Sequence, residues 1–220
     1  MNRVFEKRVV PVAVIDDAEL ACGLAEALLE GGLDIVEVTF RTPAAEESIR
    51  RIRNSFPSML VGAGTILDGD QLKRAVDAGA QFGVAPGLNE SVVGQARELA
   101  LPFIPGVMTP SEVERALRLG CKLQKLFPAD VAGGVKALKA LAGPYAHTGI
   151  RFIPLGGVNA GNAAEYLSLP IVAAVGGSWL AERKLVAQKN WATITALAAE
   201  ALAIVASVSQ QSVRNRPGKD

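Results

Sequence analysis

Eight short runs rich in aliphatic and β-branched residues alternate with helical segments along this chain of 220 residues. The predicted strands cover residues 9–15, 33–40, 59–64, 81–86, 102–106, 121–127, 151–157 and 171–177. Short apolar runs that are each followed by a helical pattern are typical of parallel strands packed against helices. No long linker separates the units, and half of the residues are hydrophobic. The sequence therefore predicts one well-buried α/β domain.

Local signals mark where several helices begin and end. The stretch TPSE at 109–112 has the spacing of a capping box, with threonine at the N-cap and glutamate three residues later. Glycines follow several helical segments and precede a strand, as expected at the C′ position: Gly32, Gly79 and Gly120. These boundaries support separate strand–helix units.

Eight strand–helix units predict a single closed (β/α)8 TIM barrel over residues 1–205. An open doubly wound sheet is the alternative, but its GxGxxG loop is missing after the first strand, where the sequence reads VAVIDDAEL. The last helix is predicted to end near Val205. Residues 206–220 are polar and are predicted to form a flexible tail.

Charge and composition argue against several classes of function. The net charge is +1 with both signs interspersed, so no nucleic-acid partner is expected. Two cysteines without a CxxC pair and one histidine, His147, disfavour a disulfide framework, a metal site and a Ser/His/Asp relay. The first apolar run is too short for a membrane span or a signal peptide. We expect a cytoplasmic protein without a membrane partner, a metal or a cofactor.

Charged side chains occur near the predicted carboxyl ends of strands, where barrels of this class carry their reactive groups. Alternation along the strand places Lys125 last on the face that it shares with Cys121 and Leu123. By the same alternation, Glu37 and Arg41 share a face at the end of the 33–40 run. The third strand also ends in a polar residue, a threonine. Three strands are then expected to direct polar side chains toward the same open end of the barrel.

That threonine is Thr65, which alternation places on the face of Met59, Val61 and Ala63. One interpretation of the whole cluster is a buried ion pair that only fills the interior. The alternative is chemical: a buried amine loses affinity for its proton, and the neutral amine adds to a ketone to form a Schiff base. Glu37 would then move protons, and Arg41 with Thr65 would bind a substrate carboxylate.

Two glycine pairs lie at the predicted ends of the last two strands, in PLGGVN (154–159) and AVGGSW (174–179). Each pair comes before a helix, so backbone N–H groups can approach an anion closely. In barrels that bind phosphorylated ligands, these two loops commonly form the phosphate site. The pattern predicts a phosphate site near Ser178.

Several motifs together resemble the 2-keto-3-deoxy-6-phosphogluconate (KDPG) aldolases, which are often also active on 4-hydroxy-2-oxoglutarate. The motifs occur in collinear order over nearly the whole chain: EVTFRT (37–42), GAGT (62–65), APGLNE (85–90), PGVMTPSE (105–112), KLFPAD (125–130), GGVKAL (133–138) and GGSWL (176–180). The resemblance implies a metal-free class I aldolase that acts as a homotrimer. Its expected reaction is the cleavage of KDPG to pyruvate and glyceraldehyde 3-phosphate in the Entner–Doudoroff pathway.

The resemblance also implies roles for individual residues. Lys125 is the expected Schiff-base residue and Glu37 the acid/base, with Arg41 and Thr65 on the substrate carboxylate. Pro86 and Phe127 are expected to pack around the pyruvyl group. The phosphate loops correspond to Gly156, Gly157, Gly177 and Ser178.

One position departs from the family pattern and leaves the substrate open. Leu155 stands where well-known members often have threonine, at a position associated with the choice between gluconate- and galactonate-derived epimers. The galactonate-series aldolase and a plain 4-hydroxy-2-oxoglutarate aldolase therefore remain alternatives. A metal-dependent sugar-phosphate epimerase and a non-catalytic barrel that binds phosphorylated metabolites are alternatives of other classes.

Overall fold

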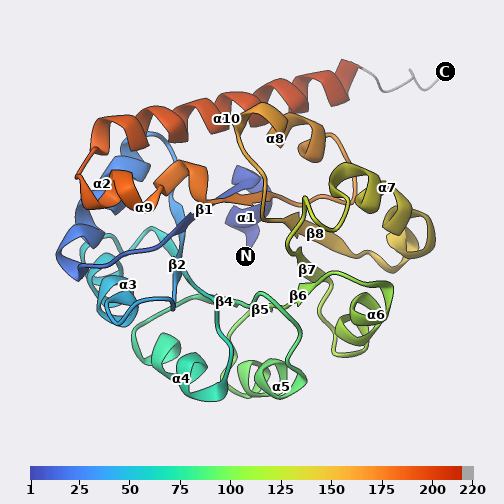
Figure 1. Cartoon of the computed structure of the whole chain (residues 1–220), viewed down its shortest axis with the longest axis horizontal. Coiled ribbons are helices and arrows are strands. Elements are labelled where there is room, and N and C mark those ends of the chain that lie inside the picture. The colour runs from blue at the N-terminus through green and yellow to red at the C-terminus, as the bar shows by residue number, and fades with distance from the viewer. Residues whose placement is uncertain (215–220) are drawn as a thin grey trace.

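The computed structural model describes residues 1–214 and forms an α/β fold in which parallel strands surround the middle and helices cover the outside (Figure 1). The strands are β1 (Val9–Ala13), β2 (Ile35–Thr39), β3 (Leu60–Gly64), β4 (Phe82–Val84), β5 (Phe103–Ile104), β6 (Gly106–Val107), β7 (Leu123–Leu126), β8 (Arg151–Pro154) and β9 (Val175–Gly177). Each of the eight predicted runs contains at least one of these strands, so the predicted strand positions are confirmed.

Helices follow most strands, as the alternation predicted. They are α1 (Asn2–Lys7), α2 (Ala21–Glu30), α3 (Ala45–Ser55), α4 (Gly69–Asp77), α5 (Glu90–Glu98), α6 (Pro110–Arg118), α7 (Gly134–Tyr145), α8 (Ala160–Leu167), α9 (Arg183–Ala187) and α10 (Trp191–Arg214). Three short 3₁₀ segments are η1 (Ala18–Leu20), η2 (Ala146–Thr148) and η3 (Ser178–Ala181). Thr109 and Glu112 form the predicted capping box of α6.

The prediction of a single closed eight-stranded barrel is wrong. Among the described residues the strands form two separate parallel sheets, one ordered β5-β4-β3-β2-β1-β9 and one ordered β6-β7-β8. The fifth predicted strand is interrupted at Pro105, which has no backbone N–H for a ladder. Two-residue β5 pairs with β4, whereas two-residue β6 pairs with β7.

The second interruption lies between β8 and β9. A single bridge, Phe152 to Val172, connects β8 to the segment before β9. The side chain of Arg8 donates to the carbonyl oxygens of Leu167, Val172 and Ala173. Arg8 thus satisfies the last carbonyl group of α8 and two carbonyl groups of the segment before β9.

The strands separate two hydrophobic clusters. The outer cluster lies between strands and helices and includes Val36, Val61 and Ala63. The inner cluster is small and faces the middle of the ring: Val4, Val10, Ile35, Leu60, Phe82, Val84, Ile104, Ile153 and Ala174. Val4 comes from α1, which lies in the middle of the ring in Figure 1. Arg3 of α1 pairs with Asp34 directly before β2, so the helix closes the interior where the strands begin.

Helix α10 extends farther than predicted. It continues to Arg214 instead of ending near Val205, while residues 215–220 of the predicted tail lie outside the described residues. Its buried positions recur every three or four residues, as expected of a helix on a protein surface: Ile194, Ala198, Ala201, Val205 and Val208. By length and composition, Trp191–Gln211 is also the one described helix that could span a membrane. Its contacts with α2 and α8 instead form part of this fold.

Candidate active site

A lysine and a glutamate face one another inside the ring. Lys125 on β7 is 4% exposed, and Glu37 on β2 is 2% exposed. Both line one small internal cavity whose other walls are mostly apolar, formed by Val4, Val10, Phe82, Val84, Ile104, Ile153, Leu155 and Gly176. Because β2 and β7 belong to different sheets, only the curvature of the fold brings the two side chains together.

The pair is not a tight salt bridge. In the described part of the chain, no ion pair within 4.0 Å joins Lys125 to Glu37. The Lys125 Nζ atom lies 4.6 Å from the centroid of the Phe127 ring, which is within cation–π range. Glu37 Oε1 is buried and accepts no hydrogen bond from any described residue. The interpretation of the cluster as a mere structural ion pair is therefore not favoured by this geometry.

Burial shifts both groups toward their neutral forms. Desolvation lowers the pKa of Lys125, and the charge of Glu37 opposes that shift only in part. Desolvation likewise raises the pKa of Glu37, opposed in part by the charge of Lys125. A neutral amine is a nucleophile, and a carboxyl group with a raised pKa holds its proton more readily and is a stronger base once ionised.

The predicted carboxylate-binding residues lie at the rim. Arg41 is exposed and follows the end of β2 by two residues. Thr65 is half-buried and follows β3 directly. The expected alternation on β3 is wrong, because Val61 and Ala63 belong to the outer cluster. Thr65 has φ 59°, and this left-handed backbone breaks the alternation of the strand at its end.

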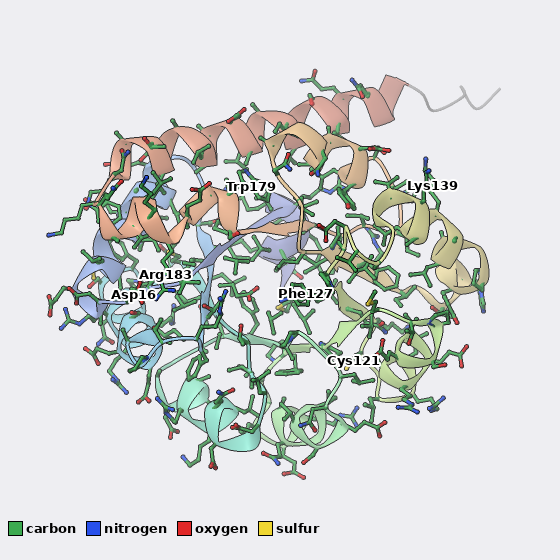
Figure 2. The ribbon with its side chains drawn as sticks, in the orientation of Figure 1. Asp16, Cys121, Phe127, Lys139, Trp179 and Arg183 are labelled. Carbon is green, nitrogen blue, oxygen red and sulfur yellow. The ribbon has the colours of Figure 1, made fainter. Side chains whose placement is uncertain are left out.

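Two further predicted residues lie near the buried pair. Phe127 follows β7 and is half-buried, near the middle of the ring in Figure 2. Pro86 is half-buried after β4 and lies against the start of β6, since a side chain on Gly106 would overlap its backbone. Both residues thus follow strands that contribute to the internal cavity.

The two glycine loops are neighbours. Gly156 and Gly157 follow β8 with φ 96° and 77°, a conformation that favours glycine. A Cβ on Gly176 would come within 2.7 Å of Leu155 Cδ1, so the end of β9 lies beside the end of β8. Gly177 ends β9, and exposed Ser178 begins η3.

Sequence reasoning missed three features of this region. The Asp130 side chain lies against Gly157, where an added Cβ would be 2.5 Å from Asp130 Cβ and Cγ. Trp179 packs on Gly177 so closely that a side chain there would overlap its ring. Arg183 at the start of α9 forms a bidentate pair with Asp16 in the loop after β1, at the edge of the ring in Figure 2. The first and the third of these features join segments far apart in the chain and therefore leave no local sequence signal.

A desolvated lysine beside a buried carboxyl group defines a site suited to Schiff-base chemistry, as used by class I aldolases. Residues 1–197 match the family model of the KDPG and KHG aldolases. The KHG/KDPG aldolase of Escherichia coli (strain K12) is 44% identical over 194 residues, which are 88% of this chain and 90% of that protein. The chain belongs to the KDPG and KHG aldolase family, as its motifs predicted.

Solved structures agree with this assignment. KDPG aldolase from Legionella pneumophila, with pyruvate captured at low pH as a covalent carbinolamine intermediate, matches with a TM-score of 0.85 and 42% identity. That match covers 89% of this chain and 95% of the other. The KDPG aldolase of Zymomonas mobilis ZM4 with 3-phosphoglycerate matches with a TM-score of 0.84 and 40% identity, over 92% and 94% of the two chains.

Proposed function

We propose that this protein is a class I carbon–carbon lyase that cleaves KDPG to pyruvate and glyceraldehyde 3-phosphate, and that it also acts on 4-hydroxy-2-oxoglutarate. The observation that carries the proposal is a buried lysine facing a buried carboxyl group across an apolar cavity. The relatives named KHG/KDPG aldolase and the neighbour that holds a pyruvate carbinolamine support both the reaction and its two substrates.

Lys125 begins the reaction. Its neutral amine adds to the C2 ketone of the substrate to form a carbinolamine. Protonated Glu37 gives its proton to the departing hydroxyl group, so water leaves and a protonated Schiff base remains beside the Glu37 carboxylate. Glu37 then takes the proton of the C4 hydroxyl while the C3–C4 bond breaks, and the electron pair of that bond moves into the Schiff base. Glyceraldehyde 3-phosphate leaves, and an enamine remains on Lys125.

The second half of the reaction reverses these steps. The enamine takes a proton at C3 from Glu37, which regenerates the protonated Schiff base. Water then adds to the Schiff base and gives a proton back to Glu37, and pyruvate leaves the neutral amine. Among the described residues, Glu37 is the one acidic side chain in the wall of the internal cavity, so we assign it the proton transfers. No metal or cofactor takes part in the proposed steps.

Residues at the rim supply binding. We propose that Arg41 and Thr65 bind the substrate carboxylate and that Pro86 and Phe127 pack against the pyruvyl group. The backbone of Gly156, Gly157 and Gly177, with Ser178, would hold the phosphate; the neighbour with 3-phosphoglycerate supports a phosphorylated ligand in this family. Leu155 lines the internal cavity and cannot donate to a substrate hydroxyl, so we propose weak discrimination between C4 epimers.

We further propose a cytoplasmic homotrimer that serves the Entner–Doudoroff pathway, on the strength of the family alone. Light scattering on the purified protein should give about three times the chain mass of 23.0 kDa. A mass of one or two chains would contradict the trimer without affecting the proposed chemistry.

Reductive trapping tests the reaction. Borohydride added with pyruvate should inactivate the protein irreversibly, and peptide mass spectrometry should place the adduct on Lys125. Lys125→Ala should give no adduct and no cleavage of KDPG, whereas Glu37→Gln should lose cleavage by about 10²-fold or more while still forming the adduct slowly. Lys122 and Lys139 are exposed, and an adduct on either would contradict the proposal. Comparing turnover of KDPG, its galactonate epimer and 4-hydroxy-2-oxoglutarate would decide the substrate.

A further inference from the structure

We infer that Gly64 is a positioning residue that directs the Glu37 carboxyl group to the reacting centre by leaving space for it on β3. The inference rests on the proposed function, because it assumes that Glu37 transfers the protons. Gly64 ends β3 within GAGT, a motif whose glycines have no role in the binding scheme described above.

The register of β2 and β3 shows how the carboxyl group is directed. The backbone partner of Glu37 is Gly62, and the partner of Thr39 is Gly64. The Glu37 side chain does not lie over its own partner, Gly62, but extends toward Gly64, two residues nearer the carboxyl end of β3. A Cβ on Gly64 would overlap Glu37 Oε1 and come within 2.7 Å of its Cδ and 2.8 Å of its Cγ.

The space over Gly62, the backbone partner of Glu37, is already filled by another side chain. A Cβ on Gly62 would overlap the ring of Phe82, which is 1% exposed and belongs to the inner cluster. Phe82 thus occupies the position directly opposite Glu37 and lines the same cavity. The space over Gly62 is occupied by Phe82, whereas the space over Gly64 is open. The Glu37 carboxyl group lies in the open space over Gly64.

Packing, and not a hydrogen bond from a described residue, holds the buried oxygen of the Glu37 carboxyl group in place. Glu37 Oε1 has no partner among the described residues, so its position depends on packing. Gly64 itself has no conformational need for glycine, because it lies in a regular strand and is not among the residues with positive φ. The absence of a side chain at this position is explained by the neighbouring carboxyl group.

Gly64→Ala tests the inference. We expect kcat for KDPG to fall about 100-fold, as for a reacting group displaced by an ångström, with little change in KM. The pyruvate adduct on Lys125 should still form. Gly83→Ala is the matched control, since Gly83 on neighbouring β4 is also crowded, with Phe103 Cδ2 at 2.7 Å from an added Cβ, but it does not touch Glu37. That control should keep kcat near the parent value.

A double variant separates the steric role from general damage. Glu37→Asp shortens the side chain, so Gly64→Ala should cost little further activity and little further unfolding free energy in that background. The inference would be overturned if the kcat loss of the double variant equalled the product of the losses of the two single variants. An unchanged kcat in Gly64→Ala would also overturn it. If Gly64→Ala alone does not fold, recovery of folding by Glu37→Asp supports the clash and continued unfolding refutes it. If the parent protein forms no pyruvate adduct, the proposed function fails. The unfolding free energies of the two single variants and the double variant still test the contact between Gly64 and Glu37.

Discussion

At the scale of single residues, the decisive property is a lysine whose surroundings disfavour its charge. Lys125 is 4% exposed, and burial lowers its pKa more than Glu37 restores it. The unfolded chain holds that lysine at its ordinary pKa of about 10.4. Between the lowered folded value and the ordinary value, the unfolded state binds more protons at this residue, so the free energy of unfolding rises with pH across that window.

This shift predicts the pH dependence of Schiff-base formation. The rate of reductive trapping with pyruvate should rise with pH as Lys125 loses its proton, and its midpoint should lie clearly below about 10.4. Trapping rates measured over a pH series give the midpoint directly. A midpoint at the ordinary value for lysine would show that the amine is solvated and that the proposed mechanism is wrong.

Lys125→Met offers a check that does not depend on catalysis. The substitution removes the titrating group, so the variant should lack the part of the rise in unfolding free energy that Lys125 contributes. Below the lowered pKa the variant should be more stable than the parent, because the parent carries a buried charge there. Denaturant titrations at several pH values would measure both effects.

At the scale of elements, the N-terminal helix has a larger role than its length suggests. α1 has six residues, and its Val4 is fully buried in the inner cluster. Val4 also lines the cavity that contains Lys125 and Glu37. By closing the interior where the strands begin, α1 helps to keep water from the amine.

Val4→Thr should therefore change the site as well as the stability. A buried hydroxyl without a partner costs about 1–3 kcal/mol of unfolding free energy. It should also admit water and move the pKa of Lys125 upward, which the midpoint of the trapping profile would report. Val36→Thr is the control, because Val36 is equally buried but in the outer cluster. Equal midpoints of the trapping profile in Val4→Thr and Val36→Thr would show that α1 contributes packing but does not affect the pKa of Lys125.

At the scale of the whole molecule, two sheets share one interior, and side chains connect them. Arg8 is half-buried, and its guanidinium group donates to the last carbonyl group of α8 and to two carbonyl groups before β9. Arg8 directly precedes β1, which pairs with β9. The arginine thus connects the strand that begins the larger sheet to the segment that separates β8 from β9.

Arg8→Met should destabilise the fold by about 2 kcal/mol, since it leaves the carbonyl groups of Leu167 and Ala173 without this charged donor. Arg3→Met should cost about 1 kcal/mol or less, because Arg3 pairs with Asp34 at the surface. Urea denaturation of both variants would compare them. A similar loss in the two variants would show that the Arg8 contacts do not stabilise the junction between the sheets.

The sequence by itself determined the strand positions, because alternation and glycine boundaries are local properties of the chain. It also determined the candidate lysine and glutamate, since each lies near the end of a strand with apolar neighbours. Tertiary structure alone decided that the ladder is interrupted between β8 and β9, that Thr65 departs from alternation, and that Glu37 rests against Gly64. These features depend on contacts between segments far apart in the chain, as does the desolvation that lowers the pKa of Lys125.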